Sequence, residues 1–301
     1  MRPKAVWEVV RDAGEAWLDD RAPRIGAALA FFTALSLAPL LVIALALAGL
    51  VYGREAAPGE VAGGLARLVG ADAARTVEGV LANPSAPRAG VVSLAVGLVT
   101  LVVGATGVFV ELQEALNDVW KVRPRPGRPV RTFVRGRAVS FGMVLGVGLL
   151  LLASLVLGSA VDAAGESAAG RALGSAAALR VVALGLAVAA EVVLFGMILK
   201  VLPDADLAWR DVLTGAVVTA ALFNLGKYLV GAFLGYSGVT TAFGAAGSLM
   251  AFLIWLYYSA LALVFGAEVA KVTAARAGRR IPPAAHAEAV PGAATPVPGG
   301  G

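Results

Sequence analysis

The stretch VVSLAVGLVTLVVGATGVFVELQEALNDVW (Val91–Trp120) decides the class of the fold. Its first 20 residues, Val91–Val110, contain no charged side chain. A helix of about 20 apolar residues is what crosses a hydrocarbon layer of ~30 Å. Carboxylates begin immediately afterwards at Glu111, and seven lysines and arginines lie within residues 118–138. So abrupt a change from apolar to charged residues predicts a transmembrane helix that leaves the bilayer.

The composition of the whole chain indicates a membrane protein. Of its 301 residues, 59% are hydrophobic and only 15% are charged, whereas a soluble domain has about 25% charged residues. The mean hydropathy is +0.82. There is no cysteine, and the single histidine, His286, lies in a segment rich in Pro, Ala and Gly. Thiolate chemistry is therefore excluded, and we expect neither a cofactor nor a metal.

Six apolar segments are long enough to cross a bilayer. Helices are the expected form, because lipid offers no hydrogen-bond partner to a free backbone group. We therefore predict an all-α, polytopic fold with six transmembrane helices within residues 25–272. The segments are Ile25–Tyr52, Val91–Val110, Ala138–Val161, Ala176–Leu199, Val212–Leu234 and Gly247–Ala267.

Lysine and arginine are distributed unevenly between the predicted loops. If the N-terminus is cytoplasmic, the cytoplasmic segments contain 18 of these residues and the external segments contain 6, while Lys227 lies within a span. Short cytoplasmic loops are enriched in Lys and Arg. We therefore predict that both termini are cytoplasmic.

Three smaller parts complete the predicted organisation. Residues 1–24 contain an amphipathic helix that we expect along the cytoplasmic surface. Residues 53–89 have apolar side chains at roughly helical spacing and are expected to form short helices over the external face. Residues 273–301 have too few large apolar side chains to fold, so a disordered cytoplasmic tail is expected. The apolar side of the first helix is formed by Val6, Val9, Val10, Ala13 and Trp17.

The end of the second predicted span has two interpretations. Glu111, Glu114 and Asp118 share one helical face. Together with Glu268, at the end of the last span, they are candidates for an acidic cytoplasmic mouth on a polar path. The simpler interpretation is an interfacial helix end, with Trp120 at the headgroup level. The basic residues that follow are expected to contact anionic lipid headgroups: Lys121, Arg123, Arg125, Arg128, Arg131, Arg135 and Arg137.

Polar residues also occur inside the predicted spans. Glu191 and Lys227 lie at similar depths in two consecutive spans, and Asn224 precedes Lys227 by three residues. Since a charge at mid-membrane costs about 2.5–3.5 kcal/mol, our hypothesis is that these three residues line an internal polar cavity. The alternatives are a structural ion pair, or a Lys227 side chain that extends to the outer interface.

The first span contains a second irregularity. Pro39 lacks the backbone N–H that a helix needs, so a bend is predicted there, and the Ser36 hydroxyl can bond the freed backbone. The bend either serves packing alone or breaks a helix that lines a cavity.

Catalytic motifs are absent from the sequence. There is no HExxH zinc motif, no phosphate-binding P-loop and no GxSxG nucleophile elbow. The basic loop also lacks the interleaved aromatic residues that single-stranded RNA usually requires. We therefore expect neither an enzyme nor a nucleic-acid partner.

Four stretches together resemble the YihY/BrkB family of bacterial inner-membrane proteins, and the similarity covers nearly all of residues 15–272. They are GAALAFFTALSLAPLL (26–41), GATGVFVELQEALNDVWKV (104–122), LPD (202–204) and GSLMAFLIWLYYSALALVFGAEV (247–269). The resemblance implies six transmembrane helices in the plasma membrane and assigns no catalytic role to any residue. The residues that match the family's motifs are Ser36, Pro39, Leu112, Asn117, Trp120, Gly244, Trp255, Tyr258, Gly266, Ala267 and Glu268.

Three functions follow from this resemblance and from the residues. Some members of the family were once labelled ribonuclease BN, but the sequence offers no site for RNA hydrolysis. Transport, or translocation of a lipid or envelope precursor, would explain the polar residues inside the spans. A structural role in the envelope would explain the same residues as packing. The sequence leaves the oligomeric state open, a homo-oligomer included.

Overall fold

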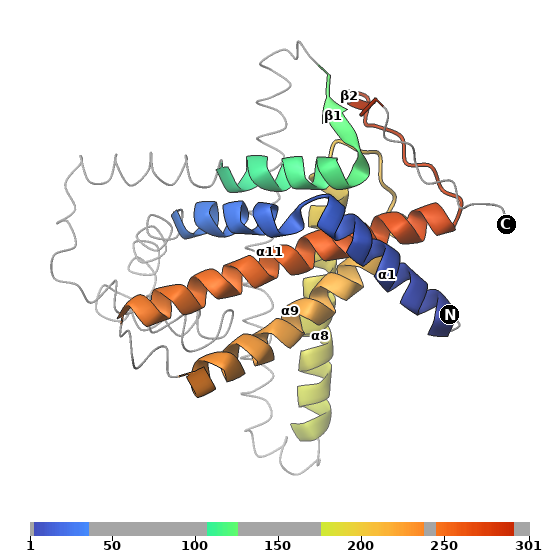
Figure 1. The fold of residues 1–301 in the computed structure, drawn as a ribbon. Coiled ribbons are helices and arrows are strands. Elements are labelled where there is room, and N and C mark those ends of the chain that lie inside the picture. Colours follow the sequence, from blue (N-terminus) through green and yellow to red (C-terminus); the bar gives the residue numbers. More distant parts are fainter. Residues whose placement is uncertain (1–2, 36–106, 126–175, 238–244, 292–301) are drawn as a thin grey trace, which may run out of the picture. The chain divides into compact units, whose positions relative to one another are not determined.

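The computed structural model of the chain describes residues 3–35, 107–125, 176–237 and 245–291, and this part of the chain is mostly helical (Figure 1). Two helices without a label in the figure cover Ala22–Leu35 and residues 107–120. The labelled helices are α1 (Pro3–Asp19), α8 (Ala176–Val201), α9 (Trp209–Ser237) and α11 (Ala245–Arg276), and the strands are β1 (Val122–Pro124) and β2 (Ala287–Ala289).

Three of the described helices are long and apolar enough to cross a membrane. Their apolar windows are Leu184–Val201 in α8, Trp209–Leu229 in α9 and Met250–Arg276 in α11, with hydropathies of 2.1, 1.4 and 1.9. They coincide with the fourth, fifth and sixth predicted spans, so the helical class is confirmed for this part of the chain. The third predicted span and most of the first two lie outside the described residues.

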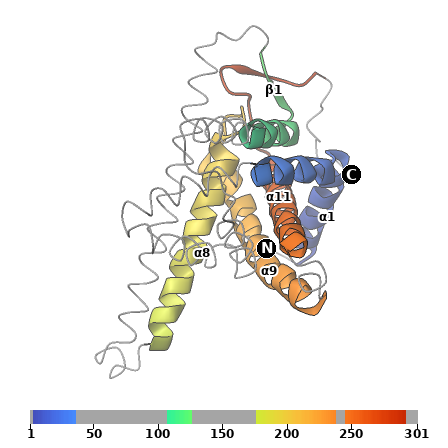
Figure 2. The same cartoon turned by 90° about the vertical axis from the view of Figure 1, so that its left-hand side faces the viewer.

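The chain forms two compact units, and α9 and α11 contribute to both. Unit 1 comprises Met1–Asp20, Leu116–Ala220 and Phe265–Gly301, and unit 2 comprises Arg21–Ala115 and Ala221–Val264. Within unit 1, α8 and α9 meet at the short connection of residues 202–208 (Figure 2). The Trp209 ring packs over Gly196 of α8, where an added Cβ would lie 2.9 Å from it.

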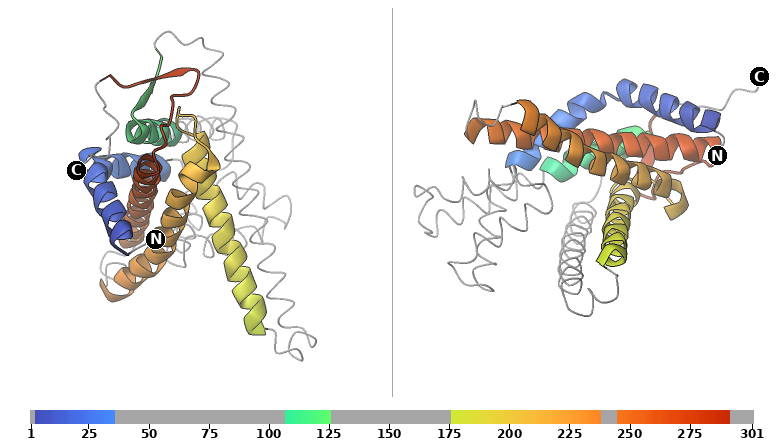
Figure 3. Two further views of the ribbon diagram at one scale, coloured as in Figure 1. Left: turned by 90° about the vertical axis from the view of Figure 1, so that its right-hand side faces the viewer. Right: turned by 90° about the horizontal axis from the view of Figure 1, so that it is seen from below.

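Small residues allow α9 and α11 to lie side by side (Figure 3). In unit 1, a Cβ on Gly215 of α9 would overlap the carbonyl oxygen of Gly266 of α11. In unit 2, Tyr258 of α11 donates a hydrogen bond of 2.8 Å to the carbonyl of Leu222 in α9. Close backbone approach of this kind is typical of helix pairs in membranes.

The expected disorder of the tail is wrong for the residues up to 291. Residues 273–276 complete α11, and Gly278, with φ of +70°, turns the chain away from the helix end. The segment then pairs with two other parts of the chain. Strand β2 pairs antiparallel with β1, and Pro283 forms a bridge with Ala205. The physical reason is that backbone hydrogen bonds to neighbouring segments replace large apolar side chains. Residues 292–301 lie outside the described part of the chain.

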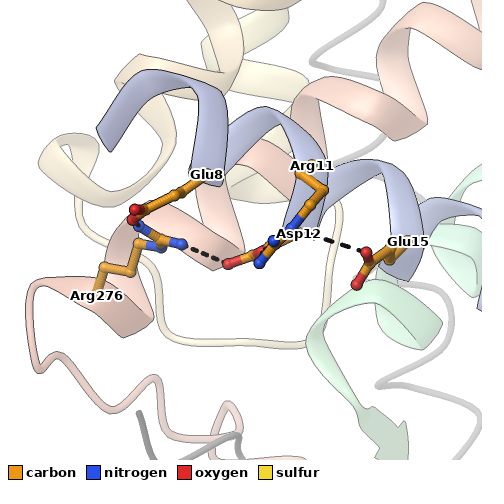
Figure 4. Close-up of polar contacts among 5 residues, drawn as sticks. All are labelled: Glu8, Arg11, Asp12, Glu15 and Arg276. Atoms are coloured by element: carbon orange, nitrogen blue, oxygen red, sulfur yellow. Dashed lines mark hydrogen bonds and ion pairs between the residues drawn. The ribbon is translucent and has the colours of Figure 1, made fainter. Parts of the chain in front are cut away.

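Helix α1 is fixed to the end of α11 by one arginine (Figure 4). The Arg276 guanidinium lies 2.9 Å from a carboxylate oxygen of Glu8 and 2.5 Å from one of Asp12. The apolar side of α1 is only partly turned inward: Ala13 is buried, whereas Val6 and Val10 are exposed.

We predict that Gly215→Ala destabilises the protein by about 1–3 kcal/mol, because the new methyl group must push α9 away from α11. Thermal unfolding in detergent micelles measures the effect. Gly185→Ala in α8 is the matched control, since an added Cβ has open space there. A Gly215 variant as stable as this control would contradict the close contact.

The contact between Asp12 and Arg276 predicts a pH dependence. The hydrogen bond from Arg276 lowers the pKa of Asp12 below its ordinary value of 3.8. Its contribution to the docking of α1 is therefore complete above that ordinary value and is lost as the pH falls through the lowered pKa. A spin label on Gly14→Cys, where an added Cβ meets nothing within 4 Å, should become more mobile on acidification. Asp12→Asn should show the greater mobility already at neutral pH.

Candidate functional site

Four charged residues of unit 1, which we call the charge cluster, meet where α1 ends and α11 nears its end. Lys121 Nζ lies 2.5 Å from Asp20 Oδ1. Lys271 Nζ lies 3.0 Å from Glu268 Oε2 and 3.8 Å from Asp20 Oδ2. The cluster therefore contains two carboxylates and two ammonium groups, and Asp20 and Lys271 each interact with more than one partner.

Three of the four side chains of the charge cluster are largely buried, whereas that of Lys121 is 40% exposed. The Glu268 side chain is 0% exposed, and those of Asp20 and Lys271 are 11% and 19% exposed. Burial of a carboxylate without a partner is strongly unfavourable, so the two lysines are required for both acids to lie here. One oxygen of each acid, Glu268 Oε1 and Asp20 Oδ2, has no hydrogen-bond donor in the described part of the chain. Two of the four carboxylate oxygens of the cluster are therefore buried without a hydrogen bond from any residue that the structure describes.

A second group, which we call the Asn117 cluster, joins three segments of unit 1. Asn117 Nδ2 donates to Asp204 Oδ2 at 3.0 Å, and Asn117 Oδ1 accepts the backbone N–H of Asp204 at 2.7 Å. His286 Nε2 lies 2.8 Å from the other carboxylate oxygen of Asp204. Asn117 and Asp204 are buried, so the cluster fixes helix 107–120 against the connection after α8.

Backbone and ion-pair contacts position the tail at the Asn117 cluster. The carbonyl of Asp204 accepts the N–H of Ala284, and the carbonyl of His286 accepts the N–H of Arg125. Arg123 pairs with Glu288 at 2.8 Å across β1 and β2. Residues 283–290 therefore contact both sides of the Asn117–Asp204 pair, whose two residues are 87 positions apart in the sequence.

Further along the tail, Arg279 reaches the beginning of α9. Its Nε lies 2.6 Å from Asp211 Oδ1. The second oxygen of Asp211 accepts the backbone N–H of Ala208 at 2.9 Å, which caps the helix. Asp211 is buried, so the same carboxylate both starts α9 and holds the tail.

The predicted acidic mouth contains residues in different environments. Glu268 is fully buried among cations, whereas Glu114 and Asp118 are exposed on helix 107–120 and Glu111 is half-buried. Helix 107–120 ends at Trp120, because Lys121 adopts a left-handed φ of 53° before β1 begins. The acidic mouth stays a prediction.

The predicted intramembrane residues are partly placed. In unit 2, Lys227 Nζ lies 3.2 Å from Asn224 Oδ1 and 4.9 Å from the centroid of the Phe223 ring, and both polar side chains are half-buried. Glu191 is half-buried in α8, which belongs to unit 1. Its relation to Lys227 stays a prediction.

Only three of the seven basic residues predicted to contact lipid lie in the described part of the chain. Lys121 and Arg123 have carboxylate partners within the protein, whereas Arg125 is exposed. The remaining candidates, and the predicted bend in the first span, lie outside the described residues: Arg128, Arg131, Arg135, Arg137, Ser36 and Pro39.

Sequence reasoning assigned no role to four polar residues that make these contacts. Asp20, Asp211 and Lys271 were not singled out, and Asp204 entered only as part of the LPD triplet, because each lies at the end of an apolar segment, where charge is ordinary. One signal was available, since Lys271 follows Glu268 by three residues and so shares its helical face. The partners of Asp204 are too distant in sequence for spacing to reveal them.

A family model described as virulence factor BrkB matches residues 13–291, which include both clusters. The chain belongs to this family. It is 32% identical over 266 residues to a UPF0761 membrane protein of Ralstonia nicotianae, covering 87% of this chain and 56% of that one. The protein is therefore a membrane protein of the BrkB family.

Two further relatives of this BrkB-family chain are also UPF0761 membrane proteins. The one from Methylibium petroleiphilum is 30% identical, with 87% of this chain and 61% of the relative covered. The one from Pseudomonas aeruginosa is 27% identical, with 91% and 64% covered. The chain thus spans less than two thirds of the length of these relatives. No solved structure matches it.

Replacement of Asn117 by aspartate tests the Asn117 cluster. We predict that Asn117→Asp destabilises the protein by about 1–3 kcal/mol. The new side chain can still accept the backbone N–H of Asp204, but its second oxygen replaces the donor Nδ2 and faces a carboxylate oxygen of Asp204. Thermal unfolding in detergent measures the loss. Asp118→Asn is the matched control, since it makes the reverse exchange at the next, exposed position. Equal stability of the two variants would contradict the buried contact.

Proposed function

We propose that this protein is a six-helix, multi-pass transporter of the bacterial inner membrane, and that it translocates a lipid, an envelope precursor or a related amphiphile. Both termini are cytoplasmic in this proposal. The observation that carries it is the charge cluster, in which a completely buried carboxylate lies near the end of a membrane-spanning helix. Ionisable groups placed at such cost in membrane proteins usually belong to a pathway for ions or substrates.

The distribution of basic residues supports the proposed orientation. Lys200 lies in the last turn of α8, Arg210 in the first turn of α9 and Arg276 in the last turn of α11. The opposite ends of α9 and α11, at Ser237 and Ala245, have no charged residue in their terminal turns. By the positive-inside rule, the basic ends are expected on the cytoplasmic side.

Polar side chains within the spans support a translocation pathway. Lys227 and Asn224 form a polar pair in the half of α9 that belongs to unit 2, and Glu191 is half-buried in α8. A polar headgroup that crosses the membrane requires such partners along its route. An amphiphilic substrate also fits a chain whose described spans expose many apolar side chains, Val181, Leu184, Leu225 and Leu229 among them.

A structural role in the envelope is the competing proposal, and one observation favours it. Both acids of the charge cluster have a lysine partner within hydrogen-bonding distance or close to it. A closed set of ion pairs fixes a fold without moving anything. The two proposals differ in what the loss of the Glu268 charge does, since it abolishes transport in one and only lowers stability in the other.

Lipid translocation is tested by reconstituting the full chain into vesicles of phosphatidylethanolamine and phosphatidylglycerol that contain a fluorescent phosphatidylglycerol. We expect a membrane-impermeant reductant to quench fluorophores from both leaflets, whereas protein-free vesicles protect the inner leaflet. Glu268→Gln should slow this exchange by roughly tenfold or more, the effect of about 1.4 kcal/mol on a barrier. Glu15→Gln, which makes the same exchange at an exposed acid of α1 outside the predicted pathway, should leave it unchanged.

The outcome separates the two proposals. If the wild-type protein leaves the inner leaflet protected and Glu268→Gln lowers only the unfolding temperature, translocation of this lipid is contradicted and the structural role is supported. If Glu15→Gln slows exchange as much as Glu268→Gln, the charge cluster is not the element that controls it.

A further inference from the structure

The outward face of α1 has an apolar stripe that no described part of the protein covers. Trp7 is 68% exposed and Leu18 is 62% exposed, and the neighbouring Val6 and Val10 are also exposed. At 3.6 residues per turn these four side chains occupy roughly one third of the helix circumference. We call them the α1 stripe. An exposed tryptophan in a stripe of this kind indicates a binding surface rather than a solvated face.

The contacts of α1 fix which way the stripe points. Ala13 is fully buried against unit 1, and the carboxylates of Glu8 and Asp12 are held by Arg276. Figure 4 shows both carboxylates on the side of α1 that meets the end of α11. The apolar stripe occupies a separate side of the helix, so its exposure is built into the way α1 is docked.

The position of α1 along the chain indicates what covers the stripe. Arg276 is the last residue of the candidate span Met250–Arg276, so α1 is attached beside the end of that span. At its other end, only Asp20 and Arg21 separate α1 from the apolar helix Ala22–Leu35. A helix that is attached to the end of a candidate span and followed directly by an apolar helix is expected at the bilayer surface.

We propose that α1 is an interfacial helix and that the α1 stripe lies in the lipid between the headgroups and the acyl chains, beside the cytoplasmic end of α11. The occupant of this surface is the bilayer itself. This inference is independent of whether the protein moves a substrate.

The charge of α1 specifies the kind of lipid contact. The helix contains two basic residues, Lys4 and Arg11, and four acidic ones, Glu8, Asp12, Glu15 and Asp19. Arg11 also lies 3.0 Å from Asp12. A net negative helix gains nothing from anionic headgroups, unlike the basic amphipathic helices that bind them. The stripe is therefore held by apolar burial, and its depth should not depend on the anionic lipid content.

Insertion of α1 also bears on the charge cluster. Asp20 follows the last residue of α1, and its carboxylate accepts a hydrogen bond from the Lys121 ammonium group. Lipid that holds α1 in place therefore holds one of the two buried carboxylates as well. Helix α1 would therefore contact the bilayer surface along its length and the charge cluster at its end.

Spin-label accessibility tests the proposal, because the natural chain has no cysteine to remove. Single labels on Trp7→Cys and Leu18→Cys probe the stripe in the full, reconstituted chain. Glu15→Cys, at a side chain that is 71% exposed on the charged side, is the matched aqueous control. Collisions with oxygen report lipid, and collisions with a water-soluble nickel complex report solvent.

We expect the labels at 7 and 18 to collide frequently with oxygen and rarely with nickel, and the label at 15 to do the reverse. The pattern should be the same in vesicles of phosphatidylcholine alone and in vesicles with added phosphatidylglycerol. Stripe labels as accessible to nickel as the control would show that water covers the stripe and would overturn the proposal. Stripe labels shielded from both reagents would overturn it in favour of a protein partner, a second copy included. A pattern that appears only with phosphatidylglycerol would overturn the apolar mode of binding.

Discussion

Glu268 is a carboxylate that the fold removes completely from solvent near the end of a candidate membrane-spanning helix, and the contacts of the charge cluster follow from that constraint. A buried anion requires a cation at a fixed place, which Lys271 supplies one helical turn further along α11. Lys271 in turn lies near Asp20, and Asp20 binds Lys121. The ends of α1, helix 107–120 and α11 are thus connected by a chain of alternating charges.

The Asn117 cluster gives a physical reason for the motifs on which the family resemblance rests. Asn117 lies in the stretch of residues 104–122, and Asp204 is the last residue of the LPD triplet. An amide that donates to a carboxylate and accepts from its backbone is satisfied only by this pairing, so each residue requires the other. Two motifs that look unrelated in the sequence are the two halves of one buried contact.

The sequence was sufficient for the three membrane-length helices that the structure describes and insufficient for their polar ends. A run such as Ala176–Leu199 predicts its helix, because the bilayer imposes both length and composition. The tail was misjudged at residues 277–291, because composition measures apolar burial and does not detect backbone pairing such as that of β2 with β1. The pairing of Asp204 with His286 was equally inaccessible, since two polar residues 82 positions apart carry no periodic signal. Helix formation can be predicted from consecutive residues, whereas the two clusters depend on contacts between residues that are distant in the sequence.

The antiparallel pairing of β1 with β2 has a consequence for the order of events during synthesis. The ribosome releases the chain from its N-terminus, and domains generally form as their segments emerge. Asn117 and Asp204 are available to each other before α11 exists, but His286 and the strand that closes over β1 emerge only after the last span. Unit 1 is therefore the part of the protein that is completed last, and a nascent chain that stalls within α11 leaves the first strand without its partner.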